Sequence, residues 1–249
     1  LKPVPTGIDH GTITVVAGGI GHEVTTFRRD VETHGRHATI AYADTAEEDA
    51  RRRDFTMNAL YARRDGTVED PLGGLADLAA RRVRFIGDPH ERIREDYLRI
   101  LRFFRFHARY GDPGAGLDPE GLAAVAAHVT GLDHLSRERV GHEMRKLLAA
   151  PDPAPSVAAM AAAGVLAHAL PGATAEALAP LVHLEGEAGV GPDPIRRLAA
   201  LGGDDPADRL RLSKAEGRRL ARLAEGMAGA EGPGALGYRY GKDGTDILL

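Results

Sequence analysis

The sequence predicts an α+β fold in which a small N-terminal β-sheet with accompanying helices precedes a long, all-helical region. Two observations support this prediction. Short β-branched stretches and a glycine-rich turn occupy the first 43 residues. After residue 88, apolar residues recur at spacings of three and four. The chain has 249 residues, 43% of them hydrophobic, which suffices for one large domain or two modest ones.

The sheet is predicted from three stretches. Thr12–Val16 is rich in β-branched residues, residues 17–21 form a glycine-rich turn, and His22–Phe27 form a second strand. His37–Tyr42 form a third strand. We expect Arg28–Arg36, which show no periodicity, to be a polar loop.

Helical patterns follow. Residues 46–64 have a helical composition, and residues 82–86 form one more short strand. Asp88-Pro89 begins a helix that we expect to run unbroken to Tyr110, with apolar residues three or four apart. Further helices are expected over 119–130, 136–149, 153–168, 174–184, 193–201 and 213–228. We therefore divide the chain into residues 1–80, 81–150 and 151–249.

Composition excludes several classes of protein. There is no cysteine, which excludes disulfides and thiolate metal sites and favours a reducing, cytoplasmic location. No apolar run approaches the length of a membrane span, so we expect no membrane partner. Residues 28–109 contain 17 arginines and no lysine. This bias fits either a GC-rich genome or the recognition of phosphates and base edges by guanidinium groups.

The segment around Arg53, Asp54 and Asn58 combines a cation, a carboxylate and an amide within six residues. A carboxylate accepts a hydrogen bond from a sugar hydroxyl, and a guanidinium binds an oxyanion, so this cluster suits a ribose and its phosphates. The alternative is the first turn of a helix with a structural ion pair.

Asp96, Arg99 and Arg102, with Arg105 beyond them, are three residues apart and predict a charged stripe on one helix. The simpler interpretation is a solvated ion pair. The functional interpretation is a base reader, in which Arg99 donates to a ring acceptor while Asp96 accepts from an exocyclic amine. Cytosine and adenine offer that order of groups, whereas guanine and uracil offer the opposite order and leave polar groups unpaired. Such a pair would admit CTP and ATP without a template.

Glu23 lies within the second predicted strand. A carboxylate on a central strand is a poor structural choice and a good Mg²⁺ ligand. A glutamate that faces solvent from an edge strand is the alternative.

Six segments occur in order along residues 4–150: HGTITVV at 10–16, EVTTFR at 23–28, RRDFTMNAL at 52–60, EDPLGGLADL at 69–78, RRVRFIGDPHERIREDYLRILRFFRF at 81–106 and LSRERVGHEMRKLL at 135–148. Together they resemble the successive motifs of the class II tRNA nucleotidyltransferase and bacterial poly(A) polymerase family. The resemblance implies a partial DNA-polymerase-β-like nucleotidyltransferase head over 1–80, a helical neck with the nucleotide-selecting helix over 81–150, and an incomplete, RNA-binding helical body over 151–249.

The resemblance also implies roles for individual residues. Arg53, Asp54 and Asn58 would contact the sugar of the incoming nucleotide, and Asp96 and Arg99 would select its base. Arg102 and Arg105 would face the triphosphate, Arg139 would close the pocket, and Glu23 would be one catalytic ligand of Mg²⁺. The partners implied are CTP, ATP and the acceptor end of tRNA. Basic residues of the body are candidates for phosphate contacts, namely Arg196, Arg197, Arg218, Arg219 and Arg222.

One departure from the family pattern concerns the chemistry. The Gly-Gly loop and the strand bearing two metal-binding carboxylates are absent from these residues. Two-metal chemistry needs such a pair to activate the 3′-hydroxyl and to neutralise the leaving pyrophosphate. We expect the pair upstream of Leu1, a further piece beyond Leu249, and no nucleotide transfer by the chain as given. Efficient CCA addition by this chain alone would contradict that expectation.

Within the family, residues 30–38 resemble the short Gly-Arg-His loop of CCA-adding members, which favours CCA addition over polyadenylation. Poly(A) polymerase remains the alternative, and enzymes that add only CC or only A stay open. A catalytically inactive RNA-binding module is the alternative from a different class. The paired Asp96 and Arg99 argue against it, because such a module has no need to select a nucleotide.

Overall fold

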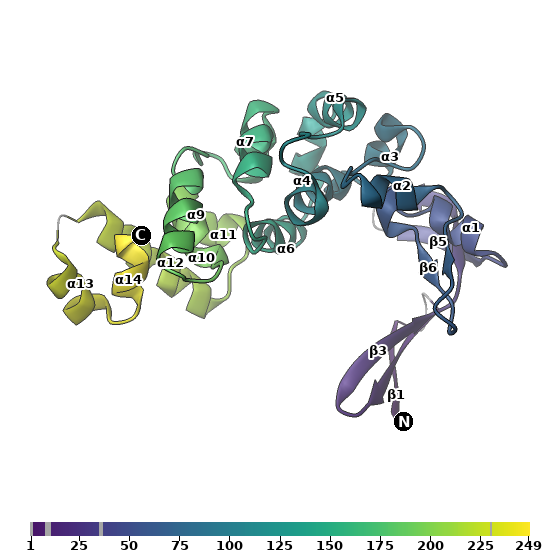
Figure 1. Cartoon of the computed structure of the whole chain (residues 1–249), viewed down its shortest axis with the longest axis horizontal. Coiled ribbons are helices and arrows are strands. Elements are labelled where there is room, and N and C mark those ends of the chain that lie inside the picture. The colour runs from purple at the N-terminus through teal and green to yellow at the C-terminus, as the bar shows by residue number, and fades with distance from the viewer. Residues whose placement is uncertain (1, 8–10, 35–36, 230) are drawn as a thin grey trace. The chain divides into compact units, whose positions relative to one another are not determined.

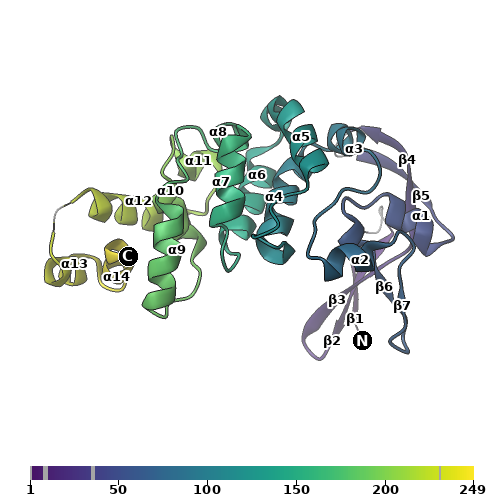
Figure 2. The same ribbon diagram turned by 45° about the horizontal axis from the view of Figure 1, so that its top comes forward.

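The computed structural model describes residues 2–7, 11–34, 37–229 and 231–249. Contacts divide the chain into two compact units. The first, here the head unit, contains residues up to 79 together with Arg84–Gly87. The second, the helical unit, contains Ala80–Val83 and Asp88–Leu249. Figures 1 and 2 show the strands confined to the head unit.

The head unit begins with a three-stranded antiparallel sheet in the order β1 (Lys2–Gly7), β2 (Thr12–Ala17) and β3 (Ile20–Thr25). Ala17 pairs with Ile20, so only two residues form the turn between β2 and β3. Both are glycines with positive φ, 57° and 81°, as the tightest hairpin turns require. The predicted strands in this region are confirmed, with a shorter turn than expected.

A second pair of strands corrects the sequence prediction. Residues 28–36 were expected to be a loop, but β4 (Arg28–His34) pairs antiparallel with β5 (His37–Tyr42). The register shifts between Asp30 and Glu32. Such a bulge interrupts the alternation of side chains, which explains why the segment shows no period of two.

The expected helix over 46–64 is also shorter than predicted. Helix α1 (Ala46–Arg51) begins at a Thr45–Glu48 capping box and is followed by the 3-10 turn η2 (Thr56–Asn58). The small hairpin β6 (Tyr61–Ala62) and β7 (Val68–Glu69) and the helix α2 (Gly74–Ala79) complete the unit. The strand predicted over 82–86 is reduced to a single bridge between Phe55 and Phe85, whose rings pack 5.0 Å apart in the core.

Among the described residues of the helical unit, every element is a helix, as predicted, apart from one isolated bridge between Ala173 and Gly202. Its elements are α3 (Pro89–Glu95), α4 (Leu98–Tyr110), α5 (Pro119–Ala127), η3 (Val129–His134), α6 (Arg137–Leu148), α7 (Ala154–Ala162), α8 (Val165–Ala169), α9 (Leu178–Glu187), α10 (Pro194–Leu201), α11 (Pro206–Arg209), α12 (Lys214–Ala228), α13 (Pro233–Tyr240) and α14 (Asp243–Leu248). Helix α4 packs against α6 and α7 and buries Leu101, Phe103 and Phe104. None of the described helices is long and apolar enough to cross a membrane.

The helix predicted over 88–110 is two helices, not one. Asp96 separates α3 from α4 in an extended conformation, with φ −155° and ψ 106°. Its carboxylate accepts a hydrogen bond from the Leu98 backbone N–H at 3.1 Å. An aspartate that bonds to a nearby backbone amide in this way competes with helix continuation and favours a helix start. The expected stripe of Asp96, Arg99 and Arg102 on one helix is therefore wrong at Asp96.

Candidate functional site

Glu23 lies on β3, at the outer edge of the three-stranded sheet, and its side chain is exposed. The expectation of a central strand is wrong, because β3 pairs with β2 alone among the described strands. Among the residues that the structure describes, no three His, Asp or Glu side chains come together as a metal site. One exposed carboxylate does not hold Mg²⁺ by itself, since such ions need several oxygen ligands. The described residues therefore do not make up a magnesium site, and the catalytic role of Glu23 stays a prediction.

The structure brings Arg53, Asp54 and Asn58 together in the head unit. Asp54 is buried, and its carboxylate accepts from the Asn58 amide at 2.7 Å. The Asn58 amide oxygen in turn accepts from the Phe55 backbone N–H at 3.3 Å. Arg53 donates to the Asn58 carbonyl at 3.4 Å, and 37% of its side chain is exposed. Arg53 is therefore accessible to a ligand, whereas Asp54 holds the turn that presents it.

Asp49 is a member of this cluster that the sequence analysis missed. It is buried on α1 and accepts from Arg52 Nε at 2.8 Å, from Arg53 Nη2 at 3.0 Å and from the Tyr61 hydroxyl at 2.7 Å. Burial by itself raises the pKa of Asp49, but the hydrogen bonds from Tyr61 and Arg52 outweigh it and hold the pKa below its usual value. The spacing of Asp49 from Arg52 and Arg53, three and four residues, was the available signal.

In the helical unit, the Asp96 carboxylate binds the Arg139 guanidinium, whereas the Arg99 backbone N–H donates to the Asp96 carbonyl at 3.0 Å. Arg139, in the first turn of α6, donates from Nη2 to Asp96 Oδ2 at 2.6 Å. Arg99 donates to the Arg92 carbonyl at 2.7 Å and pairs with Glu95. The side chains of Asp96 and Arg139 remain 23% and 26% exposed. Both members of the predicted base-reading pair are thus anchored by other residues, and Asp96 remains accessible.

Arg105, further along α4, has a counter-ion within the protein. Arg105 donates from Nε to Glu143 at 2.5 Å, and its guanidinium lies 4.7 Å from the centre of the Phe106 ring. Glu143 is buried on α6, so this pair connects two packed helices. The pairing with Glu143 gives Arg105 a structural role, and the prediction that it faces a triphosphate stays a prediction. Glu95 and Glu143 thus supply counter-charges for Arg99 and Arg105. Arg102 is half-buried and lies 5.3 Å from the same ring.

Two of the predicted RNA-binding arginines are buried. Arg196 and Arg197 are 5% and 1% exposed, and both bind the carboxylate of Glu185 on α9 at 2.6 Å. Arg196 also pairs with Asp246 of α14 at 2.6 Å. The Arg197 guanidinium donates to backbone oxygens at and just beyond the end of α6, those of Leu148, Ala150 and Pro151. Their prediction as phosphate contacts is wrong, because buried, fully paired guanidinium groups cannot reach a ligand in solvent.

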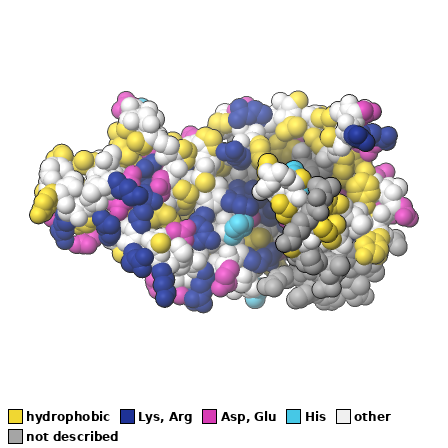
Figure 3. Space-filling model, turned by 90° about the horizontal axis from the view of Figure 1, so that it is seen from below, with side chains coloured by type: hydrophobic (Ala, Val, Ile, Leu, Met, Phe, Trp, Pro, Cys, Tyr) yellow, Lys and Arg dark blue, Asp and Glu magenta, His cyan; other side chains and the backbone are white. Residues whose placement is uncertain are grey.

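The other three predicted RNA-binding arginines, Arg218, Arg219 and Arg222, differ in how much of their side chains is exposed. Arg219 is half-buried among Asp193, Asp243 and Asp246. Burial lowers the pKa of Arg219, but the hydrogen bonds that its guanidinium donates to Asp246 and Asp193 raise the pKa well above its usual value. Arg222 is 48% exposed, and Arg218 is exposed. Figure 3 shows Lys and Arg side chains interspersed with Asp and Glu on one face of the helical unit. Arg218 and Arg222 therefore remain candidates for RNA contacts, while Arg219 belongs to an ion-pair network.

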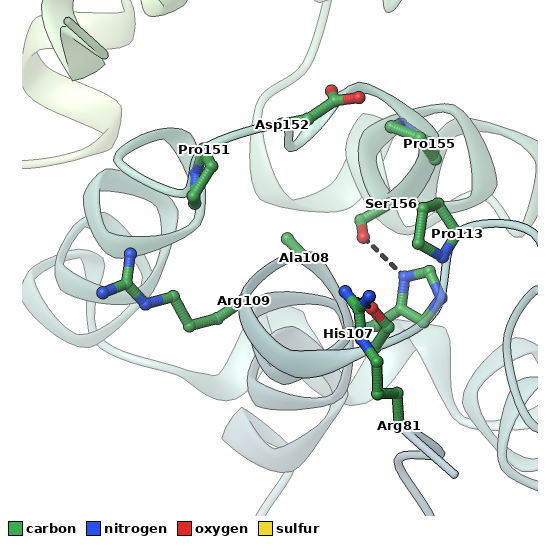
Figure 4. A pocket seen from close by; sticks show the side chains of 10 residues that line it. Arg81, His107, Ala108, Arg109, Pro113, Pro151, Asp152, Pro155 and Ser156 are labelled. Atoms are coloured by element: carbon green, nitrogen blue, oxygen red, sulfur yellow. Dashed lines mark hydrogen bonds between the residues drawn. The ribbon is translucent and has the colours of Figure 1, made fainter. Parts of the chain in front are cut away.

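A cavity of about 150 Å³ lies beside α4 and α7, with Arg81, Arg109 and Asp152 at its border (Figure 4). His107 is buried at its wall, and its Nδ1 lies 2.8 Å from the Ser156 hydroxyl. Burial lowers the pKa of His107. No step of the proposed activity uses this imidazole, so we interpret it as a contact between the two helices.

The lowered pKa of His107 predicts a loss of stability in mild acid. Burial also lowers the pKa of His128, assisted by the positive charges of His90 and Arg94. Below about pH 6.5 the unfolded chain protonates these imidazoles more readily than the folded protein does, so stability falls as the pH falls. We expect the urea midpoint to be lower at pH 5.5 than at pH 7.5, and His107→Gln to reduce this difference. Equal midpoints in the parent chain would contradict the prediction.

Comparison with known proteins decides the family. A model described as "Poly A polymerase head domain" matches residues 2–84, and one described as "Probable RNA and SrmB- binding site of polymerase A" matches residues 116–176. The chain belongs to the CCA-adding enzyme and poly(A) polymerase family.

Relatives in the family share substantial identity with part of the chain. The mitochondrial CCA tRNA nucleotidyltransferase 1 of Homo sapiens is 45% identical over 142 residues, which are 57% of this chain and 33% of the relative. The CCA-adding enzyme of Geobacillus thermodenitrificans is 40% identical over 173 residues, 69% of this chain and 42% of the relative. The chain thus spans about a third to two fifths of these curated relatives.

Solved structures confirm the fold class, a partial nucleotidyltransferase head followed by a helical region. The Bacillus stearothermophilus CCA-adding enzyme in complex with CTP aligns over 100% of this chain and 62% of its own, with a TM-score of 0.78 and 30% identity. The Thermotoga maritima CCA-adding enzyme complexed with tRNA_CCA aligns over 99% of this chain and 62% of its own, with a TM-score of 0.67. At 20% identity, this second likeness supports the fold alone.

Proposed function

We propose that the chain is part of an enzyme that adds C and A to the 3′ end of tRNA from CTP and ATP, releasing pyrophosphate. The anchored Asp96 in the break between α3 and α4 supports this proposal most directly. Arg139 and the Leu98 amide fix its carboxylate, and Glu95 fixes the neighbouring Arg99. The relatives named as CCA-adding enzymes support the same function.

The chemistry follows from what an anchored carboxylate still accepts. Each carboxylate oxygen has two lone-pair sites, so Asp96 accepts a further hydrogen bond while it holds Arg139 and Leu98. An exocyclic amine, the 4-amino group of cytosine or the 6-amino group of adenine, satisfies that acceptor. Guanine and uracil present a carbonyl oxygen there instead, which leaves two acceptors facing each other. The fixed positions of Asp96 and Arg99 strengthen the discrimination between bases, because neither side chain has to become ordered when the nucleotide binds.

Asp96→Ala tests the proposal. In the parent chain, CTP and ATP are expected to bind more tightly than GTP and UTP. The variant should lose most of this preference, with the ratio of dissociation constants falling by about tenfold or more, because an unpaired acceptor no longer penalises the wrong base. Arg102→Ala is the comparison and should weaken all four triphosphates alike. Strict retention of the C and A preference in Asp96→Ala would show that the base-selecting role is wrong.

Poly(A) addition is the second candidate, because the matching head model is described as that of a poly(A) polymerase. The same titration distinguishes poly(A) addition from CCA addition, since a poly(A) polymerase should bind ATP and hardly bind CTP. Residues 30–38, which favoured CCA addition, include Gly35 and Arg36, which lie outside the described residues.

The RNA partner is proposed to be the tRNA acceptor end. The helices over 116–176, matched by the model described as a probable RNA-binding site, carry Arg137 and Lys146 exposed on α6. These two residues join Arg218 and Arg222 as candidates for phosphate contacts. The proposal also includes a cytoplasmic location and a requirement for Mg²⁺. Among the described residues, Glu23 is the one that we propose as a ligand of this metal ion.

A further inference from the structure

Arg53 is held from several sides by residues that the family comparison does not single out. Its Nε and Nη2 both donate to Asp49 Oδ2, at 3.3 and 3.0 Å. Its Nε also lies 3.2 Å from the Tyr61 hydroxyl, and the guanidinium carbon is 5.1 Å from the centre of the Tyr61 ring. A flexible arginine normally samples many rotamers, so contacts of this kind restrict it to one orientation.

Asp49 has the properties of a fixed anchor. Its side chain is 3% exposed, and it joins α1 to β4 because the Arg28 backbone N–H donates to its Oδ1 at 3.2 Å. The Tyr61 hydroxyl donates to Oδ2 at 2.7 Å. The lowered pKa keeps this carboxylate ionised, so it remains a counter-ion for both Arg52 and Arg53.

Tyr61 completes the arrangement. Its hydroxyl donates to Asp49 and accepts from Arg53 Nε, so one group connects the anchor to the guanidinium. Burial raises the pKa of Tyr61, which keeps the hydroxyl protonated and able to donate at neutral pH. Meanwhile 37% of the Arg53 side chain stays exposed. A guanidinium held rigidly and still open to solvent is suited to bind an anion rather than only to stabilise the fold.

We propose that Asp49 and Tyr61 are positioning residues, which hold Arg53 in the orientation that binds the sugar-phosphate part of a nucleoside triphosphate. This inference rests on the proposed function. It differs from the base-selecting role of Asp96, because the sugar-phosphate part is common to all four nucleotides. The positioning pair should therefore affect affinity and leave base preference unchanged.

The test is the affinity of the complete 249-residue chain for CTP, ATP, GTP and UTP, measured by calorimetry with Mg²⁺ present. Arg53→Ala should weaken CTP and ATP binding by about tenfold or more, because a charge-assisted contact is lost. Tyr61→Phe, which keeps the ring, and Asp49→Asn, which keeps the shape, should each weaken both ligands by about three- to tenfold. The ratio between C or A and G or U should not change. Tyr42→Phe, at an exposed tyrosine of the same unit, is the matched control and should bind as the parent does.

A double variant separates positioning from general damage to the fold. If Tyr61 acts through Arg53, then Arg53→Ala with Tyr61→Phe should bind no more weakly than Arg53→Ala alone. Independent, additive losses would overturn the inference, as would parent-like binding by both Tyr61→Phe and Asp49→Asn. Thermal melts of Tyr61→Phe show whether the head unit remains folded, so the test holds even if Asp49→Asn unfolds.

The outcomes also separate this inference from the proposed function. If the parent chain binds none of the triphosphates, the proposed function fails and the inference fails with it. If the parent binds CTP and ATP selectively but Arg53→Ala binds equally well, the function stands and the positioning inference is overturned.

Discussion

Replacing Glu185 with alanine is expected to destabilise the helical unit by about 3–5 kcal/mol, since removing one member of a buried ion pair leaves the other charge uncompensated. Here one carboxylate, 3% exposed, is a counter-ion shared by the buried Arg196 and Arg197, and Arg197 has no other carboxylate partner among the described ion pairs. The loss should therefore lie toward the upper end of that range. Urea unfolding followed by circular dichroism measures it.

The same helix supplies the control. Glu187 lies two residues further along α9, is 65% exposed and pairs only loosely with His183, at 3.4 Å. Glu187→Ala should change stability by less than about 0.5 kcal/mol, as exposed pairs contribute little. Equal, small effects at both positions would show that the Glu185 network is not buried in solution.

Gly141→Ala is expected to destabilise the protein by about 2 kcal/mol or more, although the same substitution in an exposed helix is stabilising. Gly141 lies inside α6, and a Cβ there would come within 1.9 Å of the Leu210 carbonyl oxygen. That atom belongs to the backbone, so α6 and the segment after α11 would have to move apart, which costs more than helix propensity returns.

Gly186→Ala is the matched comparison. Gly186 also lies in a helix, α9, but a Cβ there meets nothing within 4 Å. Its replacement should raise stability by up to about 1 kcal/mol, the difference in helix propensity between glycine and alanine. Opposite signs for the two substitutions in thermal melts are the expected result, and a stabilising Gly141→Ala would contradict the close packing.

The sequence analysis predicted best those residues of the candidate site that lie close together along the chain. Arg53, Asp54 and Asn58 lie within six residues, so one turn brings them together. The pairing of Asp96 with Arg139 spans 43 residues and depends on how α6 packs. The resemblance named both residues, Asp96 as a selector of the base and Arg139 as the residue that closes the pocket, but no spacing along the chain indicated that the two are in contact.

The sequence by itself determined the family, the division into a β-containing N-terminal part and a helical remainder, and the segments that carry the candidate chemistry, because these depend on local patterns of residue type. Only the tertiary structure decided which arginines are accessible. The sequence predicted that Arg196, Arg197 and Arg105 contact phosphates, because their protein counter-ions could not be seen from local spacing. These counter-ions, Glu185 and Glu143, lie on other helices. Neutralisation of a charge depends on distance in space, and distance in space between helices is set by packing rather than by local pattern.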